Sequence, residues 1–229
     1  MKTRLTLLFV AFVLSVPMLL RAQSGSTMLV ASDLDCNWKL DGKPQGMLKA
    51  DGATSVSVSS GKHLVQATSV DGEDKWQTVV NVGQDQEVVE IKLKEARQLR
   101  VAEMTWTDPE TKLMWPKHDN GWGNDVNWVQ ARDYCASLTL AGYSNWRLPT
   151  VDELAGIYDK TQDVKVSLPD GIALFHVKGN IKLSGYIWGN MLPEGGRAWA
   201  YYFYEGERHA YGTGSNNMAR SLCVRQSKE

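Results

Sequence analysis

Short β-branched runs separated by glycine-containing turn pairs constrain residues 27–95 to a β-rich fold. Apolar and polar residues alternate, as where Val56 and Val58 flank Ser57. Three further runs have the same character: residues 64–68, 76–82 and 88–93. The turn pairs all end in glycine: Asp41-Gly42, Asp51-Gly52, Ser60-Gly61, Asp71-Gly72 and Val82-Gly83. Strands separated by such turns at intervals of about ten residues predict a small antiparallel β-sandwich.

Residues 38–65 carry two more specific motifs within this pattern. The first reads Trp38-Lys39-Leu40-Asp41-Gly42-Lys43-Pro44-Gln45-Gly46, and the second reads Gly61-Lys62-His63-Leu64-Val65. Together they resemble the PEGA domain, in which a V-x-V-D-G-K-x-x-G hairpin precedes a G-x-H-x-V turn and strand. Met47-Leu48 stands where that family usually has Thr-Pro. The resemblance implies a small surface-associated β-sandwich without known chemistry, with a structural role for His63.

The composition of the chain changes near residue 95. Residues 94–101 are rich in charged side chains and contain neither glycine nor proline. Beyond them, seven of the nine tryptophans lie between Trp106 and Trp199. We therefore predict two domains, at residues 27–95 and 102–229, joined by a linker at residues 96–101 that is either a short helix or the end of a strand.

Two capping-box patterns mark helix starts in the second half. Asn127 is followed by Gln130, and Thr150 is followed by Glu153. We predict a helix of about 12 residues from Trp128. The second helix has apolar residues on one face: Leu154, Ile157 and Tyr158. Glycine-rich aromatic strands follow at residues 185–188, 198–204 and 221–225.

The second half also carries a longer series of motifs. They are Trp106-Thr107-Asp108-Pro109, Leu113-Met114-Trp115, Asn127-Trp128, Gly142-Tyr143, Asn145-Trp146-Arg147-Leu148-Pro149-Thr150, Tyr186-Ile187-Trp188 and Cys223-Val224-Arg225. Over residues 104–226 they resemble the Lcl C-terminal domain, named after the C-terminal part of collagen-like adhesins. Trp188-Gly189-Asn190 stands where this family usually has Trp-Ser-Ser. The resemblance implies an α+β, C-type-lectin-like fold with two helices and an antiparallel sheet.

The chain has three cysteines: Cys36, Cys135 and Cys223. In an oxidising compartment two of them are expected to pair, which leaves three pairings open and one cysteine over. Members of the Lcl C-terminal family carry one cysteine in the first helix and another in the last strand. The resemblance therefore implies a Cys135–Cys223 disulfide and a free thiol at Cys36, which is either buried and inert or available for an intermolecular disulfide.

Residues 1–22 have the character of a secretory signal peptide. Lys2 and Arg4 precede an apolar run from Leu5 to Leu20, and small and polar residues follow. We expect cleavage after Ala22, the alternative being a retained anchor. We therefore predict export, to the periplasm, the outer-membrane surface or the exterior. No later segment is long and apolar enough to span a bilayer.

The charge balance bears on the kind of partner. Without residues 1–22 the chain has 22 basic and 26 acidic side chains, a balance of −4. This balance argues against nucleic acid or an anionic membrane as an electrostatic partner.

The region from Trp188 to Tyr211 is the predicted recognition surface for a glycan or protein ligand. The candidate ligand-binding residues are Trp188, Trp199, Tyr201, Tyr202, Tyr204, Arg208, His209 and Tyr211. In a strand, Trp199 and Tyr201 point to one face, and Tyr202 and Tyr204 to the other. One set must belong to the core, while the other can stack on sugar rings or anchor a protein partner.

The remaining polar motifs do not favour catalysis. The loop from His118 to Asp125 offers oxygen atoms to a cation, but its spacing is not that of an EF-hand, and we predict no metal or cofactor. The four histidines are scattered, and no catalytic triad or phosphate-binding loop is visible. We therefore predict an exported, non-catalytic binding or adhesion module. The alternatives are a structural envelope component that docks through the sandwich or Cys36, and an enzyme of unknown chemistry.

Overall fold

The computed structural model describes residues 25–227 apart from residues 193–194 and 217. The predicted signal peptide at residues 1–22 lies outside the described residues and stays a prediction. Most of the described secondary structure is β, in mainly antiparallel sheets, with three α-helices. Within this range no helix has the length and apolar character needed to cross a membrane.

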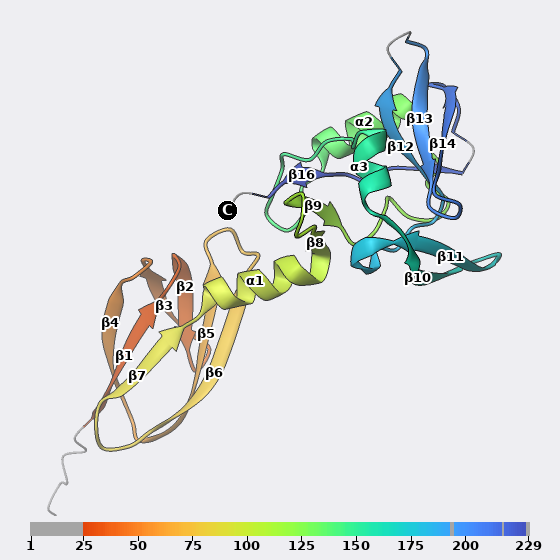
Figure 1. Cartoon of the computed structure of the whole chain (residues 1–229). Coiled ribbons are helices and arrows are strands. Elements are labelled where there is room, and N and C mark those ends of the chain that lie inside the picture. Colours follow the sequence, from red (N-terminus) through yellow and green to blue (C-terminus); the bar gives the residue numbers. More distant parts are fainter. Residues whose placement is uncertain (1–24, 193–194, 217, 228–229) are drawn as a thin grey trace, which may run out of the picture.

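Two β-sheets build the N-terminal half (Figure 1). Their strands are β1 (Ser26–Ser32), β2 (Cys36–Leu40), β3 (Lys43–Leu48), β4 (Ala53–Val58), β5 (Gly61–Ser69), β6 (Lys75–Val82) and β7 (Glu87–Ile91). One sheet has the order β4-β1-β7 and the other β3-β2-β5-β6. Alternate residues of β1, β2 and β5 are buried, and they share one core that includes Met28, Val30, Trp38 and Val65.

One strand pairing departs from the predicted all-antiparallel sandwich. β1 pairs with β7 in parallel, from Met28 opposite Glu87 to Ser32 opposite Ile91. The other pairings in this half are antiparallel. β1 and β7 are separated by the five intervening strands, so no hairpin forces them to run in opposite directions. The prediction of a purely antiparallel sandwich is therefore wrong at this pair.

Both ring nitrogens of His63 have hydrogen-bond partners in the sandwich. Its Nε2 donates a hydrogen bond to the Ser59 carbonyl oxygen at 2.8 Å, and its Nδ1 lies 2.7 Å from the Asp41 carboxylate. Asp41 and Gly42 form the β2–β3 turn with φ values of 49° and 78°, the signs that a type I′ turn requires. The hydrogen bond to Asp41 raises the pKa of the His63 imidazole, which favours the charged ring.

Cys36 is a free thiol that is fully buried in the sandwich core. Its sulfur lies 3.4 Å from the Ser32 hydroxyl, and burial raises the pKa of the thiol. A buried, protonated thiol neither reaches another molecule nor reacts readily. The alternative of docking through a Cys36 disulfide is therefore at odds with the folded sandwich.

A helix, α1 (Leu93–Met104), follows β7 and occupies the predicted linker, extending it in both directions (Figure 1). Its first N–H groups donate to the Asp33 carboxylate of the sandwich, the shortest at 2.9 Å. Farther along, Arg97 Nε and Arg100 Nε donate to the two oxygens of Asp74, at 2.6 and 2.9 Å. The Asp74 side chain is fully buried, so the helix is held to the sandwich by charge pairs that water does not reach freely.

The C-terminal half combines helices with three small sheets. Its helical elements are α2 (Trp128–Ser137), α3 (Val151–Gly156) and a 3-10 turn, η1 (Lys178–Asn180). Its strands are β8 (Thr105–Thr107), β9 (Leu113–Pro116), β10 (Tyr158–Leu168), β11 (Gly171–Val177), β12 (Tyr186–Met191), β13 (Arg197–Tyr202), β14 (Glu207–Gly212), β15 (Ala219–Arg220) and β16 (Arg225–Gln226). One sheet has the order β14-β13-β12-β15, another β16-β9-β8, and β10 and β11 form a hairpin.

Both predicted capping boxes are confirmed. The Asn127 side chain accepts a hydrogen bond from the N–H of Gln130 at 3.0 Å, and that of Thr150 accepts one from Glu153 at 3.1 Å. The Gln130 and Glu153 side chains in turn accept from the N–H groups of the two cap residues. Each box satisfies N–H groups that have no partner within the helix.

The second helix is shorter than its apolar pattern predicts. α3 ends at Gly156, and Tyr158 begins strand β10 instead of completing a helical face. The residues that follow alternate through Val164 and Val166, a period of two that favours a strand. The β10–β11 hairpin that results is a feature the predicted elements do not include.

The predicted disulfide between Cys135 and Cys223 is confirmed. It joins α2 to the segment before β16, and both sulfur atoms are buried in a cluster that includes Trp146. The largest core of the C-terminal half packs α3 and the β10–β11 hairpin against β12 and β13, and it shares no residue with the sandwich core. The sandwich core is therefore separate from the buried clusters of the C-terminal half, while the predicted domain boundaries stay a prediction.

Candidate functional site

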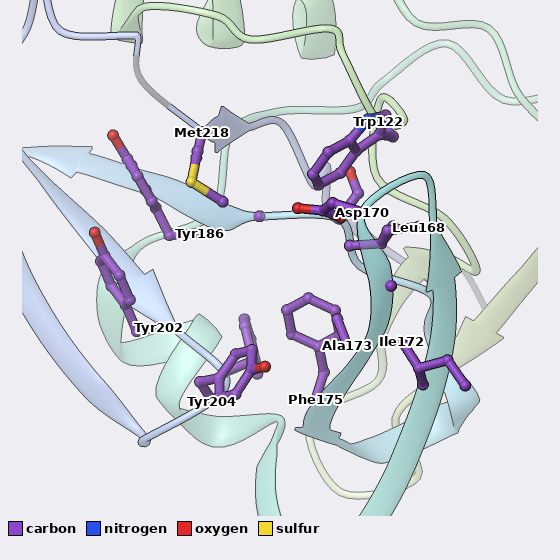
Figure 2. A pocket seen from close by; sticks show the side chains of 14 residues that line it. Trp122, Leu168, Asp170, Ile172, Ala173, Phe175, Tyr186, Tyr202, Tyr204 and Met218 are labelled. Carbon is purple, nitrogen blue, oxygen red and sulfur yellow. The ribbon is translucent and has the colours of Figure 1, made fainter.

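An open pocket of about 400 Å³ lies between the tip of the β10–β11 hairpin and the strands β12 and β13 (Figure 2). Most of its lining is aromatic or apolar: Trp122, Leu168, Ile172, Ala173, Phe175, Tyr186, Tyr202, Phe203, Tyr204 and Met218. The other lining residues are Asp170, Gly171, Ser184 and Gly185. An apolar pocket of this size with a few polar groups is typical of a ligand site.

Stacked tyrosines form one wall of the pocket. The rings of Tyr186 and Tyr202 are nearly parallel, with centroids 4.9 Å apart, and Tyr211, which does not line the pocket, stacks on Tyr186 at 5.5 Å. The hydroxyls of Tyr202 and Tyr211 are hydrogen-bonded at 2.9 Å. Burial raises the pKa of Tyr186 and of Tyr202, so both hydroxyls are neutral at physiological pH. This wall is therefore held together by ring stacking and a hydrogen bond, and it is uncharged.

The mouth of the pocket is bordered by exposed apolar side chains. Tyr204 is 56% exposed, and its ring meets the buried Phe175 edge to face, with centroids 5.6 Å apart. Ile172 and Met218, on the hairpin and before β15, are 74% and 49% exposed. Apolar side chains that gather around a concavity mark an interaction site more often than scattered ones do.

The floor of the pocket rests on a buried polar network. The Ser184 hydroxyl donates to the Asp119 carboxylate at 2.9 Å and accepts a hydrogen bond from Arg220 Nε at 2.9 Å. Arg220 also pairs with Asp125, and its guanidinium lies 5.7 Å from the ring centroid of Trp122. Burial raises the pKa of Asp119, although its hydrogen bonds oppose the effect. This network fixes Trp122 at the pocket.

The carboxylates of the loop from His118 to Asp125 belong to the same network. Asp119 binds the N–H and hydroxyl of Ser184, and Asp125 binds the buried Arg220. The side chains of Asn120 and Asn124 donate to each other's backbone carbonyl groups. These oxygen atoms hold the loop against the sheet.

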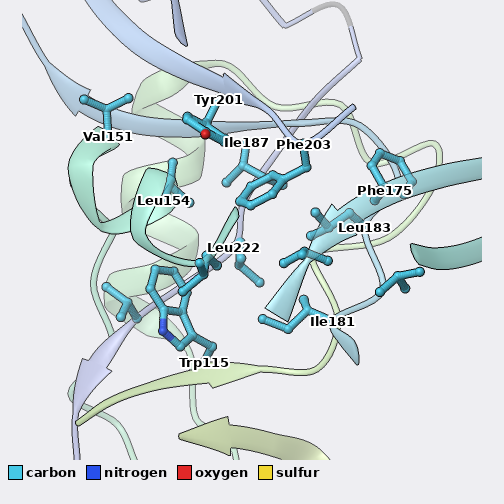
Figure 3. Packing of buried hydrophobic residues seen from close by; sticks show 14 of the residues in the cluster. Trp115, Val151, Leu154, Phe175, Ile181, Leu183, Ile187, Tyr201, Phe203 and Leu222 are labelled. Carbon is cyan, nitrogen blue, oxygen red and sulfur yellow. The ribbon is translucent and has the colours of Figure 1, made fainter. Parts of the chain in front are cut away.

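Two of the predicted ligand-binding residues line the pocket, namely Tyr202 and Tyr204. Trp188 and Tyr201 are only 0% and 3% exposed, and Figure 3 shows Tyr201 among core side chains. The prediction that Trp188 and Tyr201 belong to an exposed recognition surface is therefore wrong, because both are core residues. Tyr211 stacks on Tyr186 without lining the pocket.

The remaining predicted residues lie outside the pocket. Trp199 is half-buried against the core, with the Arg208 guanidinium 6.0 Å from its ring centroid, and Arg208 pairs with Asp152 of α3 at 3.0 Å. The His209 ring meets Tyr202 edge to face at 4.9 Å. His209 also groups with Glu205 and Glu207 near the surface, where their donor atoms lie within 4.8 Å of one another. Such a group of exposed charged side chains is common on protein surfaces without a bound ion.

The sequence predictions miss several pocket residues, above all Trp122, Asp170, Ile172 and Tyr186. They come from a loop, a hairpin and a strand that are distant in sequence. One local signal was available: Pro169-Asp170-Gly171 between two alternating runs is a typical turn sequence. It would have placed Asp170 and Ile172 at a hairpin tip, though not beside the tyrosines.

Comparison with known families supports the resemblance drawn from the motifs. Residues 104–225, more than half of the chain, match the model of the Lcl C-terminal domain. The matched residues include every residue that lines the pocket and both cysteines of the disulfide. No curated protein matches the sequence. The chain belongs to the Lcl C-terminal domain family.

Proposed function

We propose that this protein is an exported, non-catalytic module that binds a glycan through the pocket between the β10–β11 hairpin and strands β12 and β13. Membership of the Lcl C-terminal domain family indicates an adhesin-like or cell-surface module. The finer proposal, glycan recognition, rests on the pocket itself. Export rests on the signal-like residues 1–22 and agrees with a disulfide, which persists in oxidising compartments.

The observation that carries glycan recognition is a pocket lined by stacked aromatic rings with an exposed aromatic side chain at its mouth. Tyr186 and Tyr202 are held by stacking, and Tyr204 is more than half exposed at the mouth. The C–H groups of a sugar ring carry partial positive charge and pack well on the negative faces of aromatic rings. The pre-ordered side chains lose little conformational entropy when a ligand binds.

The lining favours binding over catalysis. Among the described lining residues, Asp170 is the one carboxylate, and neither histidine nor cysteine occurs. General acid–base chemistry on a glycosidic bond typically needs two carboxyl groups placed on opposite sides of that bond. The pocket therefore has the chemistry of a recognition site.

For the N-terminal half we propose a PEGA-like sandwich that acts as a spacer or docking module, and for the C-terminal half a C-type-lectin-like fold. The first proposal is supported by the Asp41-Gly42 hairpin and by His63 in its structural position. The spacer role is supported by α1, whose Arg97 and Arg100 pair with the buried Asp74.

A glycan array tests the proposed function. Wild-type protein should bind a limited set of glycans, and Tyr204→Ala should weaken that binding by about fivefold, since one aromatic contact is worth about 1 kcal/mol. Tyr134→Ala is the matched control, because Tyr134 is also partly exposed but lies on α2, outside the pocket. Array binding that is equal in wild type and Tyr204→Ala would contradict the proposed site.

A further inference from the structure

Asp170 gives the pocket a negative charge. It occupies the turn at the tip of the β10–β11 hairpin, is exposed, and forms no hydrogen bond or ion pair within the described part of the chain. In Figure 2 it lies toward Trp122, while Tyr186 and Tyr202 stand on the other side of the pocket. The carboxylate is therefore free to pair with a ligand.

The aromatic lining strengthens the preference for a positively charged ligand. Trp122, Phe175, Tyr202 and Tyr204 line the space, and the faces of aromatic rings attract cations. A carboxylate beside such rings is the combination that recognises ammonium groups. The attraction grows as the cation loses water, which a partly enclosed pocket favours.

No described lining residue offers a positive charge to an anionic ligand. The buried cation Arg220 lies against the Trp122 ring and is bound to Asp125 and to the Ser184 hydroxyl. A sulfate or carboxylate group in the pocket would lose water without gaining a cationic partner and would face Asp170. Such a group would therefore be rejected.

From these contacts we infer that the ligand is a saccharide with free, protonated amino groups, bound with an ammonium between Asp170 and the aromatic rings. This inference rests on the proposed function, because it specifies the class of glycan that the same pocket takes. An N-acetylated sugar has similar ring faces but no charge, so the two forms differ mainly in the group that Asp170 recognises.

Calorimetric titration with two matched oligosaccharides tests the inference. The probes are the tetramer of β-1,4-linked glucosamine and its fully N-acetylated counterpart, at a pH at which the free amines are protonated. We expect the amine tetramer to bind about tenfold more tightly, the ratio that corresponds to about 1.4 kcal/mol. Asp170→Asn should reduce this ratio toward one. Asp85→Asn, an exposed carboxylate of the sandwich half, should leave it unchanged.

The outcomes separate this inference from the proposed function. Equal affinity for the two tetramers, or array binding confined to neutral and acidic glycans, would overturn the inference and leave glycan recognition standing. Absence of binding to both tetramers and to every arrayed glycan would overturn both. A tri-lysine peptide that binds as tightly as the amine tetramer would overturn the claim that the ligand is a saccharide, because charge alone would then suffice for binding.

Discussion

His63 and Asp41 respond to pH in opposite directions. Their hydrogen bond raises the pKa of His63 and lowers that of Asp41. The histidine contributes stability that is fully present below its unfolded-state pKa of about 6.5 and is lost as pH rises through its higher folded-state pKa. The aspartate contributes stability that is present above its unfolded-state pKa and is lost as pH falls through its lower folded-state value. The pair stabilises most between these limits.

His63→Gln should therefore change the pH profile of thermal unfolding as well as the stability at one pH. The variant should lose the decline that His63 causes in the wild type as pH rises above about 6.5, the unfolded-state pKa of histidine. His118→Gln is the control, because His118 is an exposed histidine, and its profile should follow the wild type. Parallel curves for wild type and His63→Gln would contradict a charged His63.

The pocket shows which residues the sequence could identify. Tyr202 and Tyr204 stand out because aromatic residues are dense in their segment, and alternation predicts that neighbours along β13 face opposite sides. Alternation does not say which side is the core. The face with Tyr201 packs on α3 and the hairpin, and these neighbours are set by tertiary structure. For the same reason the sequence alone could not place Trp122 and Asp170 in the same pocket as the tyrosines.

Among the elements, those with local signals were predictable. The two capping boxes lie within four consecutive residues each, and both helices begin where these signals place them. The end of α3 was not predictable from its apolar residues, because Leu154, Ile157 and Tyr158 suit a helix face as well as the buried or partly buried positions they occupy. The parallel β1–β7 pair joins the two ends of the sandwich, and no local pattern encodes such a pair.

The 3-10 turn η1 supports a prediction at this scale. Gly179 has a φ of 70°, and a Cβ atom at this position would overlap the Trp106 ring. Gly179→Ala should therefore destabilise the C-terminal half by about 3 kcal/mol, from backbone strain and overpacking together. The measurement is chemical denaturation.

Gly83→Ala is the matched control for this substitution. A Cβ atom at Gly83 meets no described atom within 4 Å, and the backbone there is not left-handed. The control should change the free energy of unfolding by less than about 0.5 kcal/mol. A Gly179→Ala protein as stable as Gly83→Ala would contradict the close approach of η1 to Trp106.

At the scale of the whole molecule, the two separate cores predict that the halves respond differently to reduction. Replacing both Cys135 and Cys223 with serine should lower the stability of the C-terminal half by about 4 kcal/mol, because the disulfide closes a long loop. The sandwich should unfold as in the wild type, since its core contains neither residue. Scanning calorimetry should resolve the two effects. An equal downward shift of every transition would show that the halves unfold as one unit.

The Cys135–Cys223 bond also has a mechanical consequence. The sulfur atoms are 88 residues apart in sequence, and all the pocket residues except Trp122 lie between them. When the chain is pulled at points before Cys135 and after Cys223, tension crosses the sulfur–sulfur bond and bypasses this loop. About 300 Å of contour length is thereby withheld from extension. The segment that builds most of the pocket is therefore shielded from backbone tension along this path.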